Sequence, residues 1–287
     1  MKQKIMSIFT RTPLHVGAGA SVGAVDQPII RERHTAFPVI PGSSMKGVLA
    51  ALWSEELVLG DKEKLVRQQG SDPELLFGSD GDDKNIKAGK LLVGEGKILA
   101  FPVRSAKNAF AWCTCPLALA RAKRDFGLNI PSFAAIGVDQ CLAPAAMTLK
   151  DKVILEEYCL LKTGDIGEDL VTELQGIADD VAWQEELQNH LVILSDEMFS
   201  YFVENACEIA QHVKINAETG TAVSGGLFNQ VNVPSESMFY AVMHEMRDGL
   251  TEKLAEKLAK QDHVLQIGAD AGSGLGWCSV KLFDKLA

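Results

Sequence analysis

The segment from Thr12 to Trp53 reads TPLHVGAGASVGAVDQPIIRERHTAFPVIPGSSMKGVLAALW, and it decides how the rest of the chain is interpreted. Its glycines let the backbone approach a ligand closely, and Asp26 is the only acidic residue before Glu32. Residues 1–53 contain six Lys or Arg and two Asp or Glu, so they carry a charge of +4 in a chain of net charge −10. A basic segment with a glycine-rich loop and one acid suggests an anionic polymer held near a reactive carboxylate.

Two groups of polar side chains in this segment are candidates for phosphate contact. They are Arg31, Arg33, His34, Ser43, Ser44 and Lys46. The first three could be the solvated face of a strand, but their place beside Asp26 favours contact with a nucleic-acid backbone. The serines are expected to cap a helix at the PGSS turn, where free N–H groups and the lysine attract phosphate. Ordinary capping explains the same serines.

Composition describes a globular protein with a substantial core. The chain has 287 residues, of which 47% are hydrophobic and 23% are charged. No apolar run is long enough to span a membrane, and MKQKIMSIFTRTPL lacks the features of a signal peptide. We therefore expect no membrane partner and a cytoplasmic protein. The six cysteines are scattered, and the closest pair, Cys113 and Cys115, lacks further ligands nearby, so buried reduced thiols are expected rather than zinc.

The acidic residues are concentrated in one part of the chain. From Glu156 to Glu208 there are fourteen Asp or Glu and one Lys, a local charge of −13, and the remainder of the chain is therefore +3. This segment can face away from an RNA-binding groove. A solvated helical face without any partner is an equally open interpretation.

Strand and helix patterns alternate irregularly along the chain and predict an α+β fold. We expect an antiparallel sheet with helices on one face, built on a ferredoxin-like core with helical insertions and a long β-hairpin. The main expected strands cover 5–15, 90–103, 153–161, 237–244 and 277–283, the hairpin about 213–240, and the helices 43–52, 117–126, 181–207 and 250–260. The 181–207 helix is expected to break near Leu194.

The glycine-rich loop GADAGSGLG near the C-terminus is a further candidate for backbone contact. It lacks the Gly-Lys-Ser/Thr ending of a Walker motif, and no helix follows it as a dinucleotide fingerprint requires. Gly272 and Gly274 would let an RNA backbone approach the edge of the sheet. A plain β-turn is the alternative.

Three segments resemble the RAMP superfamily of CRISPR effector proteins, and specifically the backbone (fourth) subunits of type III-B Cmr complexes. The first runs from TPLHVGAG through the Val25-Asp26 loop to RERHTAFPVIPGSSMKG. The second is KLLVGEGKILAFPVRSAKNAFAWCTCPLAL, and the third is VSGGLF with the terminal loop IGADAGSGLGW. Together these segments span most of the chain, and the first is the most distinctive.

The resemblance implies that residues 1–287 form a single RAMP domain. Such a domain has an RRM-like palm and a projecting β-hairpin, the thumb, which would lie near Lys214–Pro234. Copies of the chain would stack along a CRISPR RNA beside other Cmr subunits, and Val223 and Phe228 would contact RNA from the thumb. Each copy would cut target single-stranded RNA at its own interval, dependent on Mg²⁺ or another divalent cation.

The resemblance also implies two catalytic residues. Asp26 matches the family's catalytic aspartate and is the candidate metal ligand, and His15 matches a histidine implicated in RNA contact. One carboxylate cannot hold magnesium tightly, so an RNA phosphate would complete the site. Asp26 would hold the metal or accept the proton of the 2′-OH nucleophile. From the residues alone, Asp26 could instead cap a turn, and His15 could be a satisfied core histidine.

One departure and three alternatives accompany this hypothesis. In the family, glutamates often precede the thumb proline, whereas this chain has Asn229-Gln230-Val231-Asn232. No residue of this stretch can therefore supply an accessory carboxylate. The alternatives are a non-catalytic scaffold that binds CRISPR RNA, a nucleotide-dependent enzyme that uses the glycine loops, and a metal-independent nuclease that processes guide RNA.

Overall fold

A long, mainly antiparallel sheet organises the molecule. The structure is a computed structural model that describes residues 2–19, 25–60, 63–80 and 86–285. Eleven strands form the sheet, in the order β14-β15-β1-β13-β5-β6-β10-β7-β9-β8, and β2 pairs with β5. Its longest strands are β1 (Lys2–Thr10), β5 (Leu91–Arg104), β13 (Met238–Glu245) and β15 (Trp277–Asp284).

The remaining strands of this sheet are shorter and lie mainly toward its β8 end. They are β2 (Val39–Ile40), β6 (Phe110–Thr114), β7 (Gln140–Leu142), β8 (Lys152–Leu155), β9 (Tyr158–Gly164), β10 (Leu191–Leu194) and β14 (Val264–Gln266). Two pairs, β10 with β6 and β7 with β9, are parallel. The sheet is therefore mixed in this half, and not antiparallel throughout as the sequence suggested.

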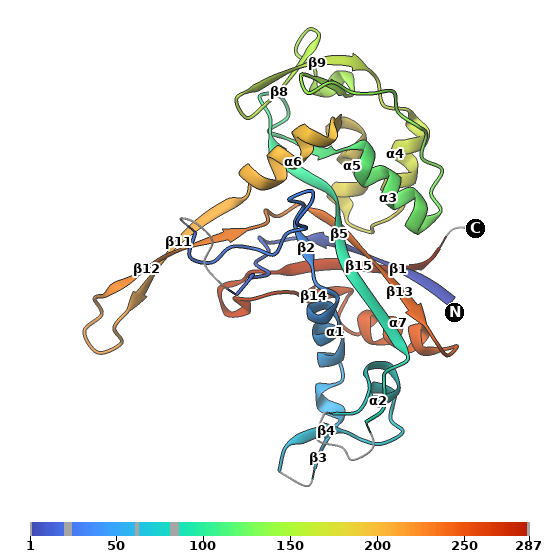
Figure 1. The fold of residues 1–287 in the computed structure, drawn as a ribbon, viewed down its shortest axis with the longest axis vertical. Helices are drawn as coiled ribbons and strands as arrows, with labels where there is room; N and C mark the ends of the chain where they lie inside the picture. Colours follow the sequence, from blue (N-terminus) through green and yellow to red (C-terminus); the bar gives the residue numbers. More distant parts are fainter. Residues whose placement is uncertain (1, 20–24, 61–62, 81–85, 286–287) are drawn as a thin grey trace.

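Helices cover both faces of the sheet, so the expectation of helices on one face is wrong (Figure 1). The reason is visible in β1, where Ile5 and Phe9 point into one core while Met6 and Ile8 point into the other. Residues of α1, α2 and α7 join the core of Met6, and residues of α4 and α5 join the core of Ile5. The helices are α1 (Gly42–Ala51), α2 (Asp72–Phe77), α3 (Pro116–Phe126), α4 (Glu168–Gln175), α5 (Val181–His190), α6 (Asp196–Asn205) and α7 (Leu250–Ala259).

A two-stranded hairpin projects from the body, as Figure 1 shows on the left. It consists of β11 (Glu208–Ile215) and β12 (Ala222–Asn232). The hairpin predicted over 213–240 is therefore displaced along the chain. Pro234 follows the end of β12, and residues from Met238 onward form a central strand of the large sheet. We call β11 and β12 the thumb. A second small hairpin joins β3 (Leu57–Leu59) and β4 (Leu65–Arg67).

None of the helices in the described ranges is long and apolar enough to cross a membrane. All six cysteines are free thiols, but the prediction that they are buried holds for only four of them. Four of them are buried, whereas Cys159 is exposed and Cys207 is half-buried. Burial raises the pKa of the Cys278 thiol to about 12, so this group stays protonated and inert.

Candidate functional site

Segments from the two ends of the chain meet at the base of the thumb. The Leu14 N–H donates to the carbonyl of Val233 at 2.8 Å, and the Gln27 N–H donates to that of Asn229 at 3.0 Å. The Ala269 N–H of the terminal glycine loop donates to the His15 carbonyl at 2.9 Å. The first resemblance segment, the end of β12 and the terminal loop therefore form one continuous hydrogen-bonded surface.

Asp26 is fixed directly to the thumb. Its Oδ2 accepts the backbone N–H of Asn229 at 2.8 Å, and the carboxylate is exposed. Its Oδ1 has no hydrogen bond to any residue in the described part of the chain. The glycine loop that precedes it includes residues 20–24, which lie outside the described residues. Asp26 is thus oriented through Oδ2.

His15 lies beneath the same strand and is 4% exposed. Its Nδ1 is 2.8 Å from the carbonyl oxygen of Val231, and because a carbonyl only accepts, Nδ1 carries a proton. In the neutral ring Nε2 is then the acceptor. A Cβ at position 17 would stand 2.8 Å from Nε2, so Gly17 makes room for the ring. His15 and Asp26 are both bound to β12, at positions 231 and 229.

Gln230 joins the thumb to the terminal loop, and the sequence analysis missed it. This side chain is 1% exposed, and its Nε2 donates to Asn232 Oδ1 at 3.0 Å and to Asp270 Oδ2 at 2.8 Å. The signal in the sequence is weak, because two amides at alternate positions of a strand usually face solvent. Residues 229–232 contain no acidic side chain, but the hydrogen bond from Gln230 holds Asp270 at the base of the thumb.

The shape of the terminal loop depends on two glycines, and these are not the two that were predicted to let an RNA backbone approach. At Gly268, with φ of +83°, a Cβ would lie 2.2 Å from the His15 carbonyl oxygen, and at Gly276 it would lie 1.9 Å from that of Ile267. Gly272 and Gly274 instead lie in an exposed turn with open space around them. They leave the backbone accessible beside Asp270.

Arg31 has a structural role in this fold. Its guanidinium donates to the carbonyls of Ala36 at 2.8 Å and Val203 at 2.7 Å, and to Cys207 Sγ at 3.2 Å. These bonds fasten residues 31–34, which we call the RERH loop, to the end of α6. With its N–H groups used in this way, Arg31 anchors the loop and is not a free phosphate ligand.

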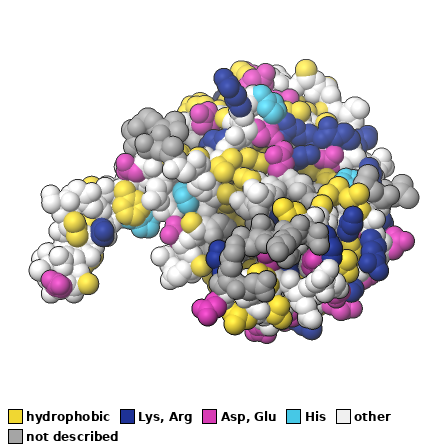
Figure 2. All heavy atoms as spheres, turned by 60° about the horizontal axis from the view of Figure 1, so that its bottom comes forward, with side chains coloured by type: hydrophobic (Ala, Val, Ile, Leu, Met, Phe, Trp, Pro, Cys, Tyr) yellow, Lys and Arg dark blue, Asp and Glu magenta, His cyan; other side chains and the backbone are white. Residues whose placement is uncertain are grey.

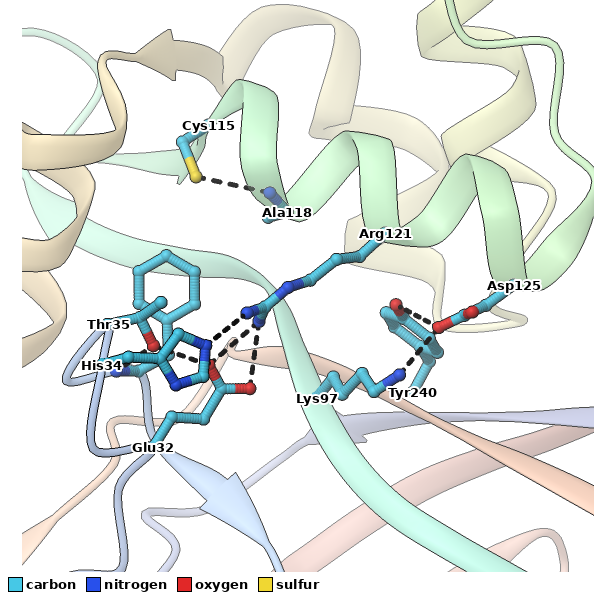
Figure 3. Close-up of polar contacts among 10 residues, drawn as sticks. Glu32, His34, Thr35, Lys97, Cys115, Ala118, Arg121, Asp125 and Tyr240 are labelled. Atoms are coloured by element: carbon cyan, nitrogen blue, oxygen red, sulfur yellow. Dashed lines mark hydrogen bonds and ion pairs between the residues drawn. The ribbon is translucent and has the colours of Figure 1, made fainter.

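Glu32 holds the same loop to α3, as Figure 3 shows. Arg121 Nη1 lies 3.0 Å from both carboxylate oxygens of Glu32, and the two side chains are only 15% and 10% exposed. The Thr35 hydroxyl donates to Oε2 at 2.6 Å. His34 remains 71% exposed beside Arg121, and Arg33 is exposed as well. Anchoring by the buried pair leaves Arg33 and His34 facing solvent.

A second polar network lies one turn further along α3 (Figure 3). Asp125 Oδ2 accepts from Lys97 Nζ at 2.9 Å and from the Tyr240 hydroxyl at 3.0 Å. Burial opposes ionisation of Asp125, but hydrogen bonds from Arg124 and Lys97 outweigh it, so the pKa of this carboxyl is lowered. This network locks α3 onto β5 and β13.

The start of α1 differs from the prediction. Pro41 is the N-cap and no side chain caps the helix, so the capping expected of Ser43 and Ser44 is wrong. The helix begins at Gly42, one residue before the predicted start. A Cβ at position 42 would lie 2.6 Å from the Val93 carbonyl oxygen, so only glycine fits there. Ser43 and Lys46 are exposed, and Ser44 is half-buried.

The predicted RNA-contacting residues of the thumb lie on the thumb as expected. Phe228 stacks on His212, with ring centroids 5.2 Å apart and planes at 18°. Val223 is half-buried near the turn. Phe228 therefore belongs to a cross-strand pair that stiffens the hairpin.

A metal ion at Asp26 would need most of its ligands from the substrate. The described residues contain no group of three or more His, Cys, Asp or Glu able to hold a metal. Asp26 offers one oxygen, and magnesium is commonly bound by one or two carboxylates together with waters and substrate phosphates. The donor set fits such a shared site and does not fit a closed protein cage.

Comparison with known proteins agrees with the arrangement of these segments. The RAMP superfamily profile matches residues 8–279. The chain is 37% identical over 294 residues to a Pyrococcus furiosus protein named CRISPR system Cmr endoribonuclease Cmr4, covering 98% of this chain and 96% of that protein. It is also 37% identical over 91 residues to Csm3 of Streptococcus thermophilus, named a CRISPR system Cms endoribonuclease, covering 30% of this chain and 39% of Csm3.

Solved structures extend the comparison to three dimensions. Oligomeric Cmr4 from Pyrococcus furiosus superposes with a TM-score of 0.71 at 29% identity, with both chains fully covered. A chain of the type III-B Cmr-beta complex bound to cognate target RNA gives a TM-score of 0.73 at 18% identity, covering 98% and 97% of the two chains, and this shows a shared fold. Since the profile and the Pyrococcus identity each extend over nearly the whole sequence, this chain belongs to the RAMP superfamily.

Proposed function

We propose that this chain is an RNA-binding backbone subunit of a type III-B CRISPR effector complex and cleaves target RNA within it. The observation that carries the proposal is the fixing of Asp26 and His15 to the base of one projecting hairpin. The full-length similarity to a protein named as a Cmr endoribonuclease supports it. In this proposal the chain acts in the cytoplasm as a single domain, with CRISPR RNA, further copies of itself and other Cmr subunits as partners.

The chemistry would use the nucleophile that RNA carries. When the thumb separates neighbouring nucleotides, a 2′-OH can move in line with the adjacent phosphorus, and such alignment contributes several kcal/mol to lowering the barrier. Asp26 Oδ1 is the group that would take the 2′-OH proton or hold a divalent cation such as Mg²⁺. That cation, when bound, supplies charge neutralisation at the phosphate.

His15, which lies beneath β12, is proposed to contact the RNA phosphate or to transfer a proton. Its Nδ1–H bond to Val231 fixes the ring, and Gly17 puts no side chain at the position 2.8 Å from Nε2 that a Cβ would take. A fixed imidazole beside a cleavage site can contact phosphate or move a proton. Because the ring is 4% exposed, this role requires RNA to approach over the glycine at position 17.

The path of the RNA backbone would follow exposed basic side chains of the palm. Arg33, His34 and Lys46 point to solvent, whereas Arg31 is used within the fold. Ser43, Ser44 and the exposed turn at Gly272 and Gly274 would add hydrogen-bonding groups along the path. Phosphate contacts of this kind determine affinity and its dependence on salt.

The test is the Asp26→Asn variant in the assembled complex. Cleavage of target RNA should fall by about 100-fold or more, while binding of guide and target is unchanged because amide and carboxylate have the same shape. Asp262→Asn is the matched control, since Asp262 is also exposed, and its φ of +50° suits asparagine. Undiminished cutting by Asp26→Asn would leave the non-catalytic scaffold as the function. Loss of target binding would show that the carboxylate shapes the loop.

A further inference from the structure

Asp270 lies at the base of the thumb and has no part in the cleavage chemistry proposed above. Its Oδ2 accepts a hydrogen bond from Gln230 Nε2 at 2.8 Å, and because Gln230 is 1% exposed, a buried amide fixes this carboxylate. The same amide nitrogen also donates to Asn232 Oδ1 at 3.0 Å. Asp270 itself is exposed, and its Oδ1 accepts no hydrogen bond from the residues that the structure describes. The carboxylate is therefore oriented at the surface through Oδ2.

The terminal loop that carries Asp270 is held together by its own hydrogen bonds. Gln266 Nε2 donates to carbonyls on both arms of the loop, at 3.3 Å to Gly268 and at 3.2 Å to Leu275. The backbone of Asp270 has φ of +62°, a left-handed conformation that Asp and Asn adopt more readily than most other residues. The loop therefore keeps Asp270 beside the exposed glycine turn at 272–274, where the proposed path of the RNA backbone runs.

No basic residue of the terminal loop balances the charge of Asp270. Residues 264–280 contain Asp270 as their only charged residue. The adjacent thumb adds little positive charge, because residues 208–232 contain Lys214 against Glu208 and Glu218, and Figure 2 shows few charged side chains on the projecting hairpin. A carboxylate repels phosphate. Asp270 would therefore oppose RNA binding unless it faces a hydrogen-bond donor of the RNA.

The ribose is the part of RNA that supplies such a donor at every nucleotide. Phosphate oxygens only accept hydrogen bonds, and the donors on base edges change with the sequence. The 2′-OH donates as well as accepts, and it is what allows a protein to tell RNA from DNA. Copies of one chain along one RNA meet different bases, so a donor that all of them can use must belong to the sugar.

We propose that Asp270 Oδ1 accepts a hydrogen bond from a ribose 2′-OH of the bound strand, and that this contact makes the chain select RNA over strands without that donor. The inference rests on the proposed function, which leads RNA past this turn, and it names a residue that determines specificity. Hydrogen bonds to an ionised acceptor are about twice as strong as those between neutral groups. One such contact is enough to give a measurable preference.

The experiment compares two strands with the full-length chain. One strand is a single-stranded RNA, and the other has the same sequence with 2′-fluoro groups, which keep the sugar pucker of RNA but cannot donate a hydrogen bond. Fluorescence anisotropy in a buffer with EDTA gives both dissociation constants, and EDTA prevents a divalent cation from bridging Asp270 to a phosphate. The preference of the wild type for RNA over the 2′-fluoro strand should be about tenfold greater than that of Asp270→Asn.

Asp270→Asn keeps the loop but replaces an acceptor by a donor. Gln230 Nε2 requires an acceptor, so the amide oxygen of the new side chain stays with Gln230 and its Nδ2 takes the place of Oδ1. The variant should bind the 2′-fluoro strand at least as tightly as the wild type does, and this result also shows that it is folded. Asp262→Asn is the matched control, since Asp262 is exposed with φ of +50°, and it should keep the wild-type preference.

Equal preferences of the wild type and Asp270→Asn would overturn the proposal. An equal loss of affinity for both strands would also overturn it, because Asp270 would then have a structural role. The same holds for a loss of preference in Asp262→Asn, since a general charge effect would explain it. In these three cases the proposed function stands, because it requires RNA binding and Asp26. A wild-type chain that binds neither strand would overturn both, whereas normal cutting by Asp26→Asn would affect the proposed function alone.

Discussion

Replacing Arg121 by methionine is expected to destabilise the fold by about 3 kcal/mol. Methionine keeps most of the aliphatic packing but removes both 3.0 Å contacts from the guanidinium to Glu32. The carboxylate, whose side chain is 10% exposed, is then left with the Thr35 hydroxyl at 2.6 Å and the exposed His34 Nε2 at 3.6 Å as polar partners in the described structure. Removing one partner of a buried pair costs about 3–5 kcal/mol, and the lower end applies because neither side chain is fully buried.

The size of this effect is measurable in a double-mutant cycle. A loss of about 3 kcal/mol should lower the melting temperature by roughly 6–10 °C for a chain of this length. Glu32→Gln removes the uncompensated charge, so the Arg121→Met, Glu32→Gln double variant should regain at least about 1 kcal/mol over Arg121→Met alone. Urea unfolding followed by circular dichroism gives the free energies. A loss below about 1 kcal/mol, or a double variant less stable than Arg121→Met, would refute the reasoning.

Three further predictions follow from the same structure. Because the folded-state pKa of Asp125 is lowered, its stabilising contribution is complete above the unfolded value of about 3.9 and is lost as pH falls through the folded value; Asp125→Asn should flatten acid unfolding curves in that window. Gly276→Ala should destabilise by about 1–3 kcal/mol in urea unfolding through backbone strain, whereas Gly272→Ala, which meets open space, should unfold like the wild type. Replacing residues 212–228 by an Asn-Gly turn should preserve the melting temperature. Deleting residues 217–231 should lower the melting temperature, because this deletion removes the buried Gln230. Equal melting temperatures of the two variants would contradict this expectation.

Much of the fold was accessible from local sequence patterns. The break expected near Leu194 is real, because four buried residues, Leu191–Leu194, form β10 between α5 and α6. A continuous apolar run of four residues is compatible with either a helix or a buried strand, and pairing with β6 decides in favour of the strand. The predicted position of the thumb differs from the observed one. Residues on both sides of Pro234 are rich in types that favour strands, and this local preference does not indicate which sheet each strand joins.

The candidate site was predictable in its segments and only partly in its side chains. The glycine-rich loop and Asp26 were recognisable because a run of glycines followed by a single acidic residue is an unusual pattern. The roles of Arg31 and Gln230 depend on partners 172 and 40 residues away, Val203 and Asp270. Sequence spacing carries no information on contacts between residues so far apart in the chain. The prediction that Arg31 contacts phosphate is therefore wrong, because this side chain anchors the RERH loop instead.

The attachment of Asp26 to β12 has a mechanical consequence. A carboxylate hydrogen-bonded to a strand of the thumb travels with that strand, and the ring of His15 is tied to the same strand two residues later. Any displacement of the hairpin therefore moves both groups together relative to the palm. In a row of identical copies, the pitch of the row would then act as the ruler that sets the distance between successive cuts, whatever the sequence of the RNA.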